Sequence, residues 1–160
     1  MTTAQRPEIK TLANLEAAFA GESMAHIKYR YFAKICRDMG DEATARAFEA
    51  TADQEVMHAF GHLDLLYPKA TLTPAKALQI AIDGETYEYT EMYPGFRATA
   101  EAEGNAAAVA EMDGQIEESK VHAAAFTAML HKAQKRFAAL AKVEERHANH
   151  YKDQLAHISA

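Results

Sequence analysis

The fold is indicated first by residues 52–59, which read ADQEVMHA and set a glutamate and a histidine three residues apart. The same spacing returns at residues 144–148, which read EERHA. A step of three residues puts both side chains on one face of a helix, one turn apart. Both stretches are rich in strong helix formers, and the chain shows no alternating strand pattern. The sequence therefore predicts an all-α protein, a helical bundle with polar groups on its helix faces.

Proline and glycine mark where the predicted helices begin and end. We predict a first helix over Pro7–Met39 and a second that starts at the N-cap Asp41 and ends near Tyr67. A third should start at Thr73-Pro74, end at Gly104 and kink at Tyr93-Pro94-Gly95, because proline disrupts a helix interior.

The remainder of the chain is helical in composition but harder to divide. Asp113-Gly114 is its best turn signal, and a further break near His131 is a second possibility. The region around residues 105–131 is therefore predicted as an extra helical segment between the third and fourth ligand-bearing helices.

The length and composition of the chain exclude several classes of protein. The 160 residues are 49% hydrophobic, which suits one domain over 1–160 with a sizeable core. The net charge of −6 disfavours nucleic acid as a partner. The one cysteine, Cys36, excludes an intrachain disulfide or a cysteine-ligated cluster and fits a reducing compartment. Because no apolar run is long enough for a bilayer or a signal peptide, we expect a soluble cytoplasmic protein without a membrane partner.

Four apolar stripes, each on a predicted helix, carry acidic residues at their centres. Burying ionised carboxylates costs several kcal/mol unless a partner or a metal compensates. A Glu from each of two helices and Glu-x-x-His from two others is the ligand pattern of di-iron carboxylate bundles, and such ligands suit iron or manganese. The sequence therefore predicts a metal pair, and its candidate ligands are Glu22, Glu55, His58, Glu85, Glu88, Glu144 and His147.

An internal repeat supports this ligand set. Gly21-Glu22-Ser23 recurs as Gly84-Glu85-Thr86, and the Glu-x-x-His-Ala motif at 55–59 recurs at 144–148. Two helix pairs, each giving Gly-Glu and then Glu-x-x-His-Ala, would build a site with approximate twofold symmetry.

The repeat leaves one alternative open for the last helix. The first half separates its two glutamates by 33 residues, and the same step from Glu85 reaches Glu118, with His122 four residues further on. Glu118 and His122 are therefore a rival ligand pair. We prefer Glu144 and His147 because they keep the three-residue step and the alanine that follows.

Four motifs, taken in order, resemble the rubrerythrin family. They read FAGESMA at 19–25, ADQEVMH at 52–58, GETYEYTEMYP at 84–94 and EERHANHY at 144–151. The resemblance covers residues 12–156. It implies a ferritin-like four-helix bundle holding two Fe ions, oxo- or hydroxo-bridged when oxidised, with Mn or a mixed pair as alternatives. The seven candidate ligands match the family's ligand positions.

The resemblance also implies an activity, the reduction of hydrogen peroxide to water by a non-haem di-iron oxidoreductase. In the family one iron changes a ligand from Glu to His when its redox state changes. The residues that match this pair here are Glu88 and His58. Tyr29, seven residues after Glu22, is a third catalytic candidate and equally an aromatic core residue. The alternatives are a ferroxidase that oxidises Fe(II) with O2 and a non-catalytic helical scaffold.

Two departures from the family suggest partners. Family members of full length carry a rubredoxin domain with four cysteines, which this sequence lacks, so we expect an external electron donor, rubredoxin-like or a flavoprotein. The stretch Pro68–Thr73 also looks too short to run back along a bundle between the second and third helices. We therefore predict a homodimer with exchanged helices.

Overall fold

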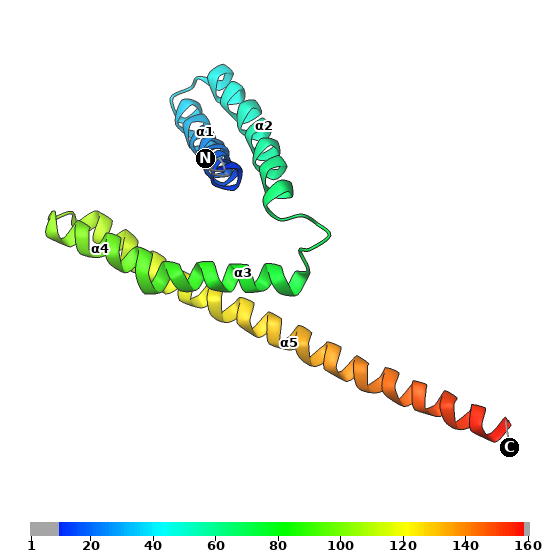
Figure 1. The fold of residues 1–160 in the computed structure, drawn as a ribbon. Coiled ribbons are helices and arrows are strands. Elements are labelled where there is room, and N and C mark those ends of the chain that lie inside the picture. Colours follow the sequence, from blue (N-terminus) through cyan, green and yellow to red (C-terminus); the bar gives the residue numbers. More distant parts are fainter. Residues whose placement is uncertain (1–9, 159–160) are drawn as a thin grey trace, which may run out of the picture. The chain divides into compact units, whose positions relative to one another are not determined.

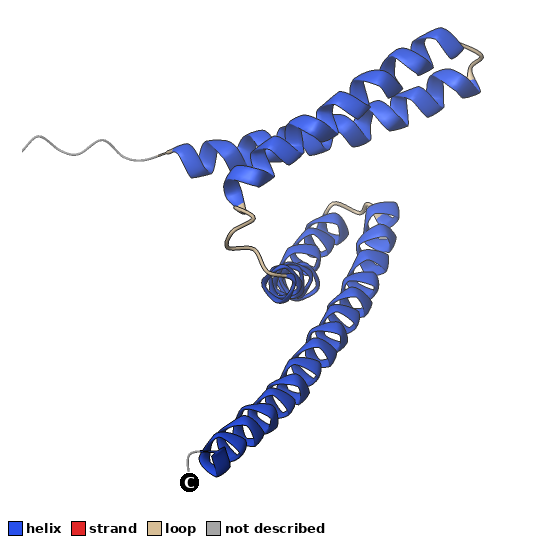
Figure 2. Ribbon diagram, turned by 90° about the vertical axis from the view of Figure 1, so that its right-hand side faces the viewer, coloured by secondary structure: helices blue, strands red, loops and turns tan. Residues whose placement is uncertain are grey.

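The computed structural model of the chain describes residues 10–158, and every regular element in that range is a helix (Figure 2). This confirms the predicted all-α class. The chain divides into two compact units, Met1–Leu72 and Thr73–Ala160. The predicted helix start at Pro7 lies outside the described residues. Among residues 10–158, no helix combines the length and the apolar character needed to cross a bilayer.

The first unit is an antiparallel hairpin of α1 (Thr11–Asp38) and α2 (Glu42–Leu66), shown in Figure 1. The turn needs Gly40, whose φ of 85° is unfavourable for residues with a side chain. Asp41 then caps α2, because its carboxylate accepts a hydrogen bond from the Thr44 N–H at 3.0 Å. The predicted stop and start at this turn are therefore confirmed.

Small side chains let the two hairpin helices approach closely. The Tyr29 ring lies 5.8 Å from that of Phe48, which also meets Phe32 at 5.6 Å. His26 donates through Nδ1 to the Ala52 carbonyl across the hairpin at 2.7 Å. Within residues 10–72, the fully buried residues are all alanines: Ala33, Ala45, Ala52 and Ala59.

In the second unit, α3 (Pro74–Tyr87), the π-helical turn η1 (Glu88–Met92) and α4 (Tyr93–Ala102) form one irregular helix. It packs along the first half of α5 (Ala106–Ile158) (Figure 1). Thr73 caps α3 by accepting from the Lys76 N–H at 3.2 Å, which confirms the predicted start. The buried apolar residues here are Ala100, Ala123 and Leu130.

The predicted kink takes the form of a π turn directly before Pro94. The Tyr93 N–H bonds to the Glu88 carbonyl, five residues back rather than four. Pro94 has no N–H and its ring would crowd the carbonyl four residues earlier in a regular helix. The wider turn accommodates the proline without ending the helix.

The predicted turn at Asp113-Gly114 is wrong, and so is the break near His131. Helix α5 runs without interruption for 53 residues, so the extra segment at 105–131 is simply its first half. The real turn is at Gly104, with φ of 72°, followed by Asn105, whose side chain accepts from the Ala108 N–H at 3.1 Å. Gly114 is tolerated because a helix-interior glycine costs only about 1 kcal/mol, which packing on α3 and α4 offsets.

Candidate metal centre

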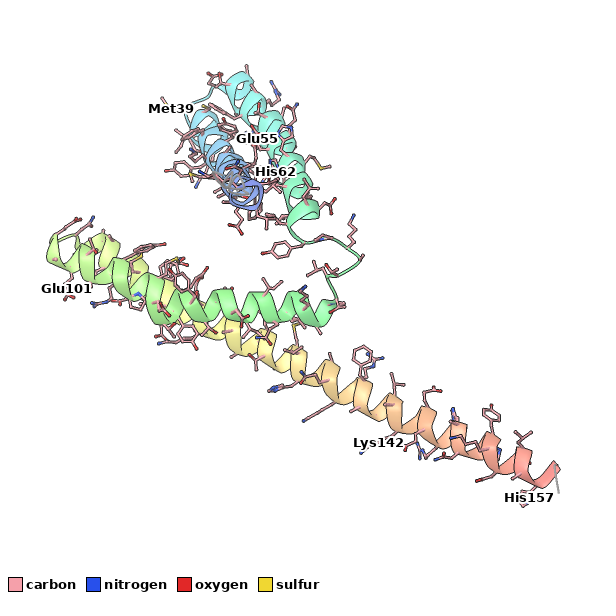
Figure 3. The ribbon with its side chains drawn as sticks, in the orientation of Figure 1. Met39, Glu55, His62, Glu101, Lys142 and His157 are labelled. Atoms are coloured by element: carbon pink, nitrogen blue, oxygen red, sulfur yellow. The ribbon has the colours of Figure 1, made fainter. Side chains whose placement is uncertain are left out.

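The first group of candidate ligands lies on the hairpin and is called the hairpin cluster: Glu22 on α1 with Glu55 and His58 on α2. One ligand atom from each residue lies within 4.8 Å of the other two. The His58 Nδ1 is 2.9 Å from a Glu55 oxygen and 4.0 Å from a Glu22 oxygen. Figure 3 labels Glu55 on α2. The spacing and the donor types suit a divalent metal ion.

The environment of this cluster argues for a cation. The Glu55 side chain is 16% exposed and that of Glu22 is 31% exposed, so both carboxylates are partly withdrawn from water. Because an ionised carboxylate accepts hydrogen bonds only, the Nδ1 of His58 is the donor toward Glu55. The lone pair of His58 is then on Nε2, where it is available to a metal.

The second group lies where α3 and η1 pack on α5 and is called the α5 cluster: Glu85, Glu88, Ser119 and His122. The Ser119 hydroxyl donates to Glu88 Oε2 at 2.9 Å. The His122 Nδ1 lies 3.4 Å from Glu85 Oε2. Two carboxylates and one imidazole thus come together within the second unit.

One atom of the α5 cluster lacks a hydrogen bond. Glu85 Oε2 is buried, and among the described residues no side chain or backbone group hydrogen-bonds to it. His122 is close enough for an ion pair but its geometry does not make a hydrogen bond. A buried carboxylate oxygen left without a partner is costly, and a metal ion is a natural way to satisfy it. The residues present therefore fit a bound metal.

The predicted ligands of α5 lie in different surroundings from the others. Glu144 and His147 are exposed on its second half, in the stretch that Figure 3 marks with Lys142 and His157. Their assignment as ligands stays a prediction. Of the rival pair, His122 lies beside Glu85, whereas Glu118 is exposed.

Sequence reasoning missed Ser119. This residue is 3% exposed and occupies the inward position one turn before His122. The available signal was the step of three from Ser119 to His122, the same step that joins Glu144 to His147.

The tyrosines near the clusters differ in their surroundings. Tyr29 packs on Phe48 in the hairpin, which fits an aromatic core residue, and its catalytic role stays a prediction. Burial raises the pKa of Tyr93, and the nearby charges of Glu88 and Glu85 raise that pKa further. Tyr93 therefore stays protonated as a hydrogen-bond donor at neutral pH.

These features define a helical protein with clustered carboxylate and histidine side chains. The rubrerythrin family model matches residues 13–130, well over half of the chain, so the chain belongs to the rubrerythrin family. The matched residues include both clusters and end before Glu144.

The chain is also similar in sequence to individual members of this family. The chain is 41% identical to nigerythrin of Nitratidesulfovibrio vulgaris over 111 residues, covering 62% of this chain and 55% of that one. It is 38% identical to rubrerythrin of Porphyromonas gingivalis over 106 residues, covering 59% and 53%. A solved structure of fully reduced, all-ferrous nigerythrin is 36% identical, covers 82% of this chain and 71% of that one, and gives a TM-score of 0.39.

The chain spans about half the length of the curated relatives it matches. Membership of the family implies a di-iron centre, which confirms the predicted cofactor, and candidate ligands Glu22, Glu55 and His58 are present.

Proposed function

We propose that this protein reduces hydrogen peroxide to water at a di-iron centre, with electrons from an external donor. The observation that carries the proposal is the buried Glu85 oxygen without a hydrogen bond, in a cluster of two carboxylates and an imidazole. A pair of ferrous ions, when bound, supplies the two electrons that peroxide reduction requires. Family membership supports the same chemistry.

We propose as metal ligands the residues assigned from the sequence. The hairpin contributes Glu22, Glu55 and His58, and the second unit contributes Glu85 and Glu88. For the remaining ligands, Glu144 with His147 stay the pair proposed from the sequence. His122 is the competing imidazole, supported by its position 3.4 Å from Glu85.

The chain's own residues have distinct tasks in this proposal. The carboxylates balance the charge of two divalent cations in a site partly closed to water, where electrostatic interactions are stronger than in bulk solvent. The Nδ1–H···Glu55 bond orients the His58 ring and keeps one nitrogen free as a ligand. Glu88 and His58 are the proposed redox-exchange pair, and Tyr29 is the proposed hydrogen-bonding or electron-supplying tyrosine.

The partners follow from the same reasoning. We propose a rubredoxin-like protein or a flavoprotein as electron donor, the cytoplasm as location, and a homodimer with exchanged helices. Support for the dimer comes from Pro68–Thr73, the stretch between α2 and α3, which is too short to run back along a bundle.

The first experiment is anaerobic loading with Fe(II), desalting and measurement of iron per chain. We expect about two irons, as the proposed ligand set can hold two metals. The diferrous protein is then mixed separately with equimolar hydrogen peroxide and O2 while the absorption of the oxidised centre is followed. Faster oxidation by peroxide, without release of iron, supports the proposal. Faster oxidation by O2 with release of ferric iron would instead identify a ferroxidase.

Three variants distinguish the ligand assignments: Glu144→Ala, His122→Ala and Glu118→Ala. A large loss of iron in Glu144→Ala alone supports the pair at 144 and 147. A large loss in His122→Ala alone assigns the imidazole to the first half of α5. A large loss in Glu118→Ala would assign the carboxylate to the rival pair instead, and Glu55→Ala should lose iron in either case.

A further inference from the structure

We infer that Ser119 is a positioning residue for Glu88 and stands where a carboxylate ligand would otherwise lie. The inference rests on the proposed di-iron function. Its starting point is burial: among residues 10–158, Ser119 is the one polar side chain classed as fully buried, with 3% of its surface exposed. A buried hydroxyl is retained at little cost only when it is hydrogen-bonded.

The hydrogen bond of Ser119 is unusual for a helical hydroxyl in this protein. Ser23, Thr86 and Thr127 each donate to the carbonyl four residues back in their own helix. That local bond is the common choice for serine and threonine in helices. Ser119 instead donates across to Glu88, 31 residues earlier in the chain and on the facing element. Its hydroxyl is therefore directed at the candidate ligand.

A repeat within α5 shows which residue type Ser119 replaces. Ser-x-x-His-Ala at 119–123 and Glu-x-x-His-Ala at 144–148 are 25 residues apart. Since a helix makes about seven turns in 25 residues, the two motifs lie on nearly the same face. The aromatic and leucine positions after each histidine also correspond: Phe126 with Tyr151, and Leu130 with Leu155. In this alignment Ser119 corresponds to Glu144.

A serine in place of a glutamate at position 119 changes the charge and the hydrogen bonds around the proposed metal site. A third carboxylate beside Glu85 and Glu88 would add negative charge, whereas a hydroxyl adds none. Ser119 has one proton to donate and gives it to Glu88 Oε2. This fixes the orientation of the carboxylate and leaves Oε1 as its freer oxygen. Hydrogen bonds to the side chains that bind a metal tune its affinity by about 10- to 100-fold.

The test is anaerobic Fe(II) titration of the whole chain, with the visible spectrum of the oxidised centre as a second readout. We expect Ser119→Ala to weaken binding of the more weakly held Fe(II) by about tenfold or more and to shift the spectrum. Ser119→Thr keeps a hydroxyl and should restore both. Thr127→Ala is the matched control, because it removes a half-buried hydroxyl from the same helix that bonds only to the Ala123 carbonyl. It should leave both readouts unchanged.

A double-mutant cycle keeps the test decisive if Ser119→Ala also disturbs folding. If Ser119 acts through Glu88, then adding Ser119→Ala to Glu88→Gln should cause little further loss of affinity. Losses that simply add, or a Ser119→Ala protein with wild-type affinity and spectrum, would overturn the inference. A wild-type protein that binds no Fe(II) would overturn the proposed function and this inference together.

Discussion

Asp41 shows how one side chain can define the end of a helix. Hydrogen bonds from the Thr44 side chain and then from its backbone N–H lower the pKa of Asp41. A carboxylate whose pKa is lowered by folding stabilises the folded state above its unfolded pKa. That contribution disappears as the pH falls through the folded pKa.

We therefore expect Asp41→Ala to lower the melting temperature by a few degrees at pH 7. The difference from wild type should shrink as the pH falls below the ordinary aspartate pKa of about 4 and then through the lowered pKa of folded Asp41. Thermal unfolding followed by circular dichroism across that range measures it. A difference independent of pH would show that the charge of Asp41 has no part in the capping.

Glu85 has one buried oxygen atom that lowers the stability of the metal-free protein. Because Glu85 Oε2 is buried without a hydrogen bond, the metal-free protein should gain stability when the charge is removed. We expect Glu85→Leu to raise the free energy of unfolding by about 1 kcal/mol in the presence of a chelator. The same variant should lose the stabilisation that added Fe(II) gives to the wild type.

Urea denaturation with and without anaerobic Fe(II) tests this prediction. Glu91→Leu is the control, because Glu91 is an exposed glutamate of the adjacent π turn. A metal-free Glu85→Leu protein less stable than wild type would mean that the ion pair with His122 outweighs the cost of burying the Glu85 oxygen.

At the scale of elements, local chemistry made most boundaries predictable. Asp41 and Thr73 predict helix starts because an N-cap needs only a side-chain oxygen and the backbone N–H three residues later in the sequence. The turn predicted at Gly114 was wrong because a glycine shows that the backbone is free to turn. It does not show whether packing holds the residue in a helix instead. The facing helices, which the sequence does not position, decided that outcome.

Two glycines give a direct test of this explanation. Gly114 lies inside α5, and an added Cβ would meet no atom within 4 Å, so Gly114→Ala should stabilise the protein by up to about 1 kcal/mol. Gly104 has equal space but a φ of 72°, so Gly104→Ala should destabilise it by about 1 kcal/mol. Urea denaturation of both variants measures the contrast. Stabilisation by Gly104→Ala, or destabilisation by Gly114→Ala, would contradict the assigned turn.

The candidate ligands could be predicted where they fall at helical spacing on an apolar stripe. Glu22, Glu55, His58, Glu85 and Glu88 could be named as candidates because they interrupt apolar stripes at helical spacing. Ser119 has no such signature, since a single hydroxyl is unremarkable until its partner is known. That partner, Glu88, is 31 residues away, and the contact depends on how α5 packs against η1.

At the scale of the whole molecule, the assembly is the main prediction. Each unit leaves large apolar side chains exposed, such as Met24 and Ile27 on α1 and Phe137 and Leu140 on α5. Exposure on this scale is typical of surfaces that become covered on association. We expect multi-angle light scattering to give about twice the 17.6 kDa mass of one chain. A monomer that still holds two irons would contradict the dimer.

The π turn at Glu88–Met92 carries a consequence for the history of the sequence. A π turn amounts to one residue inserted into a regular helix. Deleting that residue would rotate α4 about its own axis by about 100°, so that a different face of α4 would pack against α5. Pro94 would then meet the crowding that the wide turn relieves. The inserted residue and the proline should therefore occur together in related sequences. Aligned relatives that lack the extra residue should also lack the proline.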